Sequence, residues 1–153
     1  MKPISFLRPF SLAVVYASIM FCLFSAVMAT PVGAVETGNI TYAALGTDRT
    51  AAYKIVNQRD VFARDTPKIV CVWRVKGVKS GTVLKGVWIA GDIGNAAPPN
   101  LKIVEKSMTI TIENEGSLYM TKPTNGWPVG KYRLEIYLND ARVKTLPFTI
   151  KAE

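Results

Sequence analysis

The stretch NGWPVGKYRLEIYLND, residues 125–140, contains the clearest structural pattern in the chain. Apolar and polar residues alternate from Lys131 to Leu138. The apolar set is Tyr132, Leu134, Ile136 and Leu138, and the polar set is Lys131, Arg133, Glu135 and Tyr137. Because successive side chains of a strand point to opposite faces, this pattern predicts a strand with the first set in the core and the second set toward solvent.

A second strand is predicted directly after this one. Asn139 and Asp140 favour a tight turn, since both residue types tolerate unusual backbone angles. The chain then continues as RVKTLPFTIK, residues 142–151, in which Leu146, Phe148 and Ile150 form the apolar set. We therefore expect a C-terminal β-hairpin.

Further short apolar stretches recur upstream between turn signals. The segment KIVCVWRV, residues 68–75, is apolar on both faces and predicts a central strand. SMTITIEN, residues 107–114, alternates, and GSLYMTK, residues 116–122, is its expected partner. Other strand candidates are residues 39–45, 51–57 and 82–90. Seven to eight strands with this spacing predict an all-β sandwich or barrel.

The N-terminal region differs from the rest of the chain. Lys2 and Arg8 precede the uncharged apolar run Phe10–Ala29, which is the layout of a secretory signal, and we expect it to cover residues 1–34. An uncleaved membrane anchor is the alternative, because about 20 apolar residues cross a bilayer. Both interpretations predict export, since no Lys or Arg occurs between Arg8 and Arg49.

The chain carries a formal net charge of +8. Removal of residues 1–34 would take away Lys2 and Arg8 and leave 17 basic against 11 acidic residues, a net charge of +6. This charge favours an anionic surface or an acidic polysaccharide as a contact, and it also suits an ordinary solvated surface. It is spread along the chain, and we expect no nucleic acid partner.

Cys71 is the one cysteine that remains after residue 34. An intrachain disulfide is then impossible. Two interpretations stay open: a buried, inert thiol in the central strand, or a disulfide to a partner protein.

The closing hairpin resembles the last two strands of immunoglobulin-like or fibronectin type III-like sandwich domains of exported bacterial proteins. VFARDTPKIVCVWRV, residues 61–75, is similar to their early part. The resemblance implies that Tyr132, shortly after Gly130, bonds through its hydroxyl to nearby backbone. Trp127 is expected to cap the end of the sandwich, with a ligand contact as the alternative. Residues 35–52 would form an N-terminal strand or extended lead-in, and residues 53–153 a disulfide-free immunoglobulin-like domain.

Catalysis is disfavoured by composition. The chain contains no histidine, which removes Ser-His-Asp arrangements and His-containing metal sites. The acidic residues are scattered and lack a calcium-loop spacing. We therefore predict no enzyme, no cofactor and no metal.

Candidate partner contacts are mainly basic. Arg74, Lys76, Lys79 and Lys85 surround the predicted KGVKSG hairpin and, if its two strands are adjacent, gather at one end of the sandwich, although a solvated loop is the more common explanation of such a group. Tyr137 lies on the polar face of its strand. The loop GDIGNAAPPN, residues 91–100, is a further place for recognition.

These features predict an exported, non-catalytic binding or structural module. The first hypothesis is a protein-interaction component of a bacterial envelope or extracellular assembly, located in the periplasm or outside the cell and using sheet edges or end loops. The alternative is a carbohydrate-binding module, for which Tyr119, Trp127 and Tyr137 would have to form an exposed aromatic row. The membrane would be contacted only through an uncleaved N-terminal segment.

Overall fold

The computed structural model describes residues 39–111 and 115–152 of the chain. The predicted signal segment, residues 1–34, lies outside these residues, so its cleavage and the export that it implies stay predictions. Within the described ranges, none of the helical structure is long and apolar enough to span a membrane.

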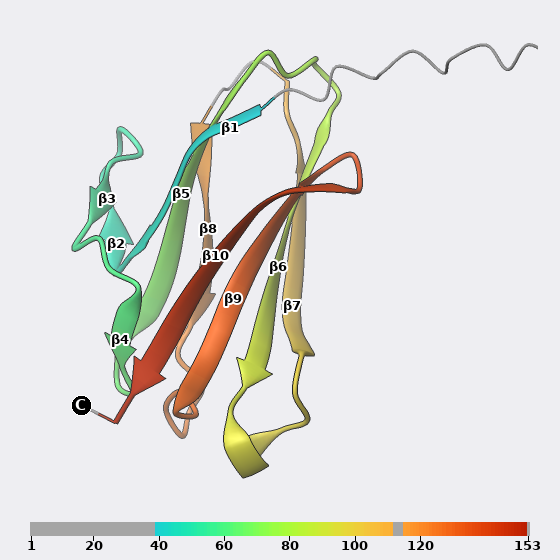
Figure 1. Ribbon diagram of the computed structural model, residues 1–153. Helices are drawn as coiled ribbons and strands as arrows, with labels where there is room; N and C mark the ends of the chain where they lie inside the picture. Colours follow the sequence, from blue (N-terminus) through green and yellow to red (C-terminus); the bar gives the residue numbers. More distant parts are fainter. Residues whose placement is uncertain (1–38, 112–114, 153) are drawn as a thin grey trace, which may run out of the picture. The chain divides into compact units, whose positions relative to one another are not determined.

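The described residues form strands joined by loops and one short 3₁₀ turn (Figure 1). The strands are β1 Asn39–Gly46, β2 Asp48–Arg49, β3 Ile55–Val56, β4 Val61–Ala63, β5 Lys68–Lys76, β6 Val83–Asp92, β7 Leu101–Thr109, β8 Glu115–Thr121, β9 Gly130–Leu138 and β10 Ala141–Lys151. The 3₁₀ turn, Gly94–Ala96, lies in the predicted loop between β6 and β7. The all-β prediction is confirmed.

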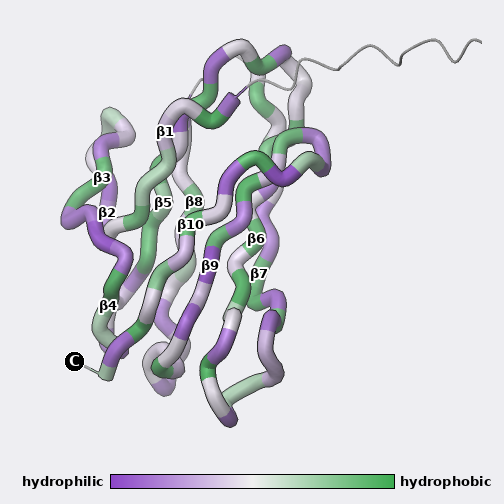
Figure 2. The backbone as a smooth tube through the Cα atoms, viewed as in Figure 1, coloured by the Kyte–Doolittle hydropathy of each residue, from purple (hydrophilic) through white to green (hydrophobic). Residues whose placement is uncertain are grey.

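Two sheets make up the sandwich. The three-stranded sheet has the order β1-β5-β8, and the five-stranded sheet has the order β4-β10-β9-β6-β7. A small ladder of β2 with β3 contacts β5, where Lys68 Nζ pairs with Asp48 Oδ1 at 2.8 Å. Because the apolar run of β5 is buried on both faces, β5 is the central strand that its sequence predicts (Figure 2).

The C-terminal hairpin is confirmed. β9 and β10 pair antiparallel over most of their length. At the turn, Asn139 and Asp140 have positive φ angles of 46° and 67°, a conformation that these residue types accept more readily than most. The predicted apolar faces of β9 and β10 both point into the core, where Leu134, Ile136 and Ile150 have no exposed surface.

The expected pairing of residues 107–114 with residues 116–122 is wrong. β7 pairs with β6, and β8 pairs with β5, so the chain changes sheets between two consecutive strands. Packing explains the choice: Trp73 of β5 lies against Gly116 of β8, at a place where a Cβ would collide with the indole ring. The two strands thus lie at edges of different sheets.

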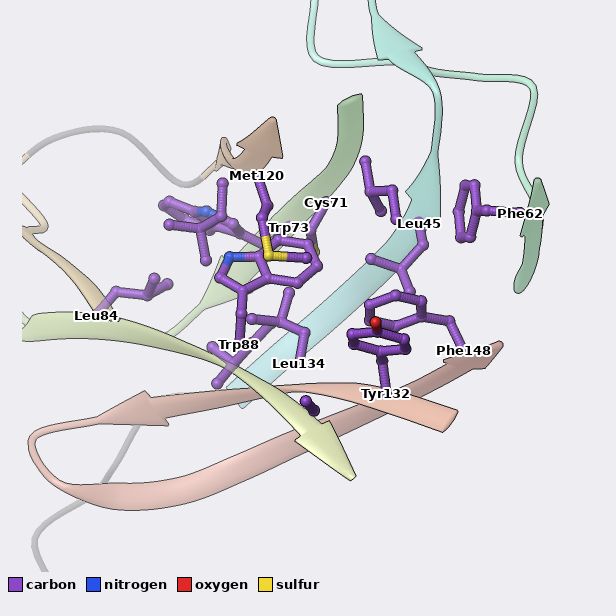
Figure 3. Close-up of a cluster of buried hydrophobic side chains, with 14 of the residues drawn as sticks. Leu45, Phe62, Cys71, Trp73, Leu84, Trp88, Met120, Tyr132, Leu134 and Phe148 are labelled. Carbon is purple, nitrogen blue, oxygen red and sulfur yellow. The ribbon is translucent and has the colours of Figure 1, made fainter. Parts of the chain in front are cut away.

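The core fills the space between the sheets with large side chains (Figure 3). Tyr132 and Phe148 stack with ring centroids 5.3 Å apart, and Phe148 meets Trp88 and Phe62 edge to face at 5.9 and 5.8 Å. Such offset and edge-on geometries suit the charge distribution of aromatic rings. This aromatic group joins both halves of the closing hairpin to β4 and β6.

Candidate functional site: the open edge of the sandwich

The described residues offer few side chains for acid–base catalysis or metal binding. The chain has no histidine. Over residues 39–111 and 115–152, no three Cys, Asp or Glu side chains come together as metal ligands would. Glu115 is held in an ion pair by Arg74, with 2.8 Å between Oε2 and Nε.

The corner before β9 is built by Trp127 and Tyr132. Trp127 is 2% exposed, and its Nε1 donates a hydrogen bond of 2.7 Å to the carbonyl oxygen of Thr66. Tyr132 Oη donates to the carbonyl oxygen of Pro128, also at 2.7 Å, and burial raises the pKa of this phenol to about 12. Both aromatic residues thus pack inside and bond to backbone, which leaves no ring face for a ligand.

Gly130 completes this corner. Its φ of 148° is one that only glycine adopts readily, and a Cβ here would meet the backbone of Asp92 and Ile93. The corner residues therefore hold the end of β9 close to the end of β6.

The four basic residues near the β5–β6 turn lie on different parts of the sandwich. Arg74 belongs to the three-stranded sheet, where its guanidinium also lies 5.1 Å from the ring centre of Tyr42. Lys85 belongs to the five-stranded sheet. Lys76 and Lys79 are exposed near the connection between the two strands. The predicted KGVKSG hairpin is wrong, because β5 and β6 belong to different sheets. The fold therefore brings Lys76 and Lys79 to one end but places Arg74 and Lys85 in opposite layers.

Lys85 lies beside Tyr137 on the outer face of the five-stranded sheet. Its Nζ pairs with Asp140 Oδ1 at 2.6 Å and lies 5.1 Å from the centre of the Tyr137 ring. The hydrogen bond to Asp140 raises the pKa of Lys85. Two of the predicted contact residues are thus neighbours, and their polar groups already have partners within the chain.

Glu135 differs from its predicted position toward solvent, since its side chain is 6% exposed. Tyr137 Oη donates to Glu135 Oε2 at 2.6 Å, while Arg133 and Arg142 approach Oε1 at 2.7 and 3.3 Å. These donors, Tyr137 first and Arg133 next, lower the pKa of Glu135. Long neighbouring side chains bury this carboxylate on the outer face, an effect that alternation alone does not reveal.

Cys71 lies in the core between the sheets with no exposed surface. Burial raises the pKa of its thiol to about 12, so the reactive thiolate is strongly disfavoured. In this fold the thiol is out of reach of a partner's sulfur.

The most open part of the sandwich is the edge formed by β8 and β7. β8 pairs with β5 on one side, and no strand of the described residues pairs with its other side. From Gly116 to Thr121 this free edge carries no charged residue, and Tyr119 is 62% exposed. Charges are a common way to protect a free edge; within β8 only Glu115, at its start, is charged, and residues 116–121 lack that protection.

β7 extends beyond the three-stranded sheet. Gly86 of β6 packs directly against the Leu118 side chain of β8, so β8 lies over β6 and covers the inner face of β7 only in part: Val104 and Met108 are half-buried and Lys106 is exposed. A hollow of about 600 Å³ results, lined by β7 between Ile103 and Met108 and by β8 between Ser117 and Thr121. We call this region, the free side of β8 with the inner face of β7, the open edge.

Sequence reasoning did not find the open edge. A signal was present, since residues 116–121 form a run without charge between Glu115 and Lys122. If this run had paired with β7 as expected, both of its sides would have been covered. In the structure β7 and β8 belong to different sheets, which leaves one side of β8 without a partner strand among the described residues.

Similarity to solved structures supports the fold. An immunoglobulin-like protein from Pseudomonas aeruginosa matches with a TM-score of 0.52 at 11% sequence identity, over 74% of this chain and 96% of that chain. The alkylpurine DNA glycosylase AlkC from Pseudomonas fluorescens, in a complex with DNA containing an abasic site analog, matches with a TM-score of 0.50 at 10% identity, over 76% of this chain and 31% of that chain.

At these identities the likeness concerns the fold alone. No family model matches the chain, and no curated protein matches it. The predicted resemblance to immunoglobulin-like domains is confirmed as a likeness of architecture: the described residues form an all-β, immunoglobulin-like sandwich.

Proposed function

We propose that this chain is an exported, non-catalytic interaction module of a bacterial envelope or extracellular assembly, and that it contacts a partner protein through the open edge. The fold is proposed to be the disulfide-free, fibronectin type III-like variant, which the buried lone Cys71 and the Tyr132 corner support.

The free side of β8 is the observation that carries this proposal. An edge strand presents unpaired N–H and C=O groups that can bond to another strand, and a partner strand would gain these bonds together with the hollow beside them. Tyr119, 62% exposed at this edge, provides a large contact surface. Backbone pairing and a hollow for side chains are the two components of recognition by strand addition.

A carbohydrate-binding module receives less support. Such a module needs several exposed aromatic rings, and Trp127 is buried while Tyr137 is part-buried. Of the aromatic residues that the structure describes, Tyr119 alone is exposed. A single ring supports stacking on one sugar at most.

A photo-crosslinking amino acid at position 119 tests the proposal in the producing cell. The same probe at Lys79, at the basic end, and at Lys144, an exposed residue of β10, provides the comparison. We expect one discrete protein adduct from position 119 and none from position 144. An adduct from position 79 without one from position 119 would show that the partner contacts the basic end and not the open edge. The absence of adducts from both positions would contradict the proposal.

A further inference from the structure

The open edge contains one charged residue where the rest of the lining is apolar or neutral. Lys106 lies on the inner face of β7, the face that points toward the three-stranded sheet. The register of β7 on β6 establishes this, because the partners of these residues are buried core positions. Val104, Lys106 and Met108 lie opposite Trp88, Gly86 and Leu84.

Lys106 has no ion-pair partner among the described residues. On the same strand, Lys102 pairs with Glu105 at 3.2 Å. Lys106 lines the hollow together with Val104 and Met108, both part-buried. The hollow therefore offers a single positive charge between two apolar positions.

A strand added to the free side of β8 would lie opposite β7. Side chains that point to one face of a strand repeat every second residue, at about 6.6 Å. Three successive inward side chains of the added strand would thus match the spacing of Val104, Lys106 and Met108. The outward side chains between them would continue the surface on which Tyr119 lies.

We propose that the open edge accepts an extended segment of a partner protein in which an acidic residue has a large apolar residue two positions before it and two positions after it. The carboxylate pairs with Lys106, and the apolar residues cover Val104 and Met108. This inference rests on the proposed function and adds the chemistry of the partner to it.

A second copy of this chain does not fit the requirement. None of its acidic residues has a large aliphatic residue at both the second position before it and the second position after it. Its net charge of +8 also favours an acidic partner over another copy. The occupant is therefore a different protein.

Three end-blocked peptides test this inference on the full chain: Ser-Ile-Thr-Glu-Thr-Ile-Ser and its counterparts with Gln or Lys in place of Glu. We expect the Glu peptide to bind about threefold more tightly than the Gln peptide, because Lys106 is exposed in the free protein and an ion pair with an exposed lysine contributes modestly. Binding should shift the amide resonances of residues 116–121.

Two charge-reversal variants separate local pairing from general attraction. Lys106→Glu should reverse the preference so that the Lys peptide binds best. Lys144→Glu, an exposed residue of β10, makes the same change in net charge away from the hollow and should keep the preference for Glu. Near-ultraviolet circular dichroism checks that both variants are folded.

Equal binding of the Glu and Gln peptides, or an equal effect of both variants, would overturn the acidic specificity. Failure of all three peptides to bind would also overturn it, as would a homodimer that Tyr119→Lys dissociates. The crosslinking at position 119 tests the proposed function independently. An adduct at position 119 together with equal binding of the Glu and Gln peptides would support a partner at the open edge and reject the preference for an acidic segment.

Discussion

The two edges of the sandwich differ in what joins the sheets. At one edge, residues 57–63 pass from the three-stranded to the five-stranded sheet: Arg59 N donates to the Leu45 carbonyl at 3.0 Å, and Thr149 N donates to the Asp60 carbonyl at 2.8 Å. β4 then pairs with β10. We call this the closed edge. At the open edge, no backbone hydrogen bond among the described residues joins β7 to β8.

Burial follows the same division. Near the closed edge, Phe62 and Leu45 are 1% and 5% exposed, whereas Leu101 and Ile103 of β7 are 46% and 42% exposed. The division concerns β7 and not β8, whose Leu118 is 3% exposed, and Val61 of β4 at the closed edge is itself 40% exposed. Regions with few buried apolar contacts contribute least to stability and are free to take part in binding. We therefore expect substitutions at the closed edge to cost more stability than substitutions on β7, and we propose the open edge as the place where a partner binds.

The largest expected effect lies at the closed edge. Phe62→Ala removes a buried ring that meets Phe148, and we expect a loss of about 3–5 kcal/mol in the free energy of unfolding. The matched change on β7, Ile103→Ala, should cost less than about 1 kcal/mol because the side chain is 42% exposed. Urea unfolding measures both, and equal losses would remove the distinction between the edges.

A smaller loss is expected at the corner before β9. Tyr132→Phe removes the hydrogen bond to the Pro128 carbonyl and keeps the ring, so we expect a cost of about 1 kcal/mol. Partner binding at the open edge should be unchanged. Loss of binding at an unchanged melting temperature would show that the corner is part of the contact surface.

The effect of Glu135 depends on pH. Because the pKa of this carboxyl is lowered in the folded state, its ionised form stabilises the fold above the ordinary pKa of a glutamate. That contribution is lost as the pH falls through the lowered pKa. We expect the stability of the natural chain to fall more steeply between about pH 5 and pH 3 than that of Glu135→Gln. Parallel curves would contradict this role of the outer-face network.

The smallest effect on stability is expected at the open edge itself. Tyr119→Lys places a charge on the free edge of β8, at an exposed position, and should change the free energy of unfolding by no more than about 0.5 kcal/mol. A charge on an edge opposes strand addition, so binding of the Glu peptide should be strongly reduced. Thermal unfolding and peptide titration give the two values, and a normal affinity would contradict the assignment.

Local sequence patterns predicted the elements of the fold better than their partners. Alternation predicted β9 and β10, and the apolar run on both faces predicted the central β5. The pairing of β8 with β5 involves contacts between residues far apart in the sequence, such as Trp73 with Gly116 and Arg74 with Glu115, which no local pattern contains. Alternation predicted Glu135 on the solvent face of β9, which is correct for its face. It did not predict that long neighbouring side chains on that face bury the carboxylate. Lys85 and Tyr137, which the sequence offered as candidate contact residues, lie side by side because β6 pairs with β9, and no local pattern contains that pairing.

Residue-resolved amide hydrogen exchange on the free protein tests whether β8 has a free edge. We expect rapid exchange for the amides of residues 116–121 that do not bond to β5, and slow exchange for the β10 amides that are bonded in the closed edge. Addition of the Glu peptide should slow exchange in β8 and leave β10 unchanged. Slow exchange throughout β8 in the free protein would mean that this edge is already covered, and would contradict an open, strand-accepting edge.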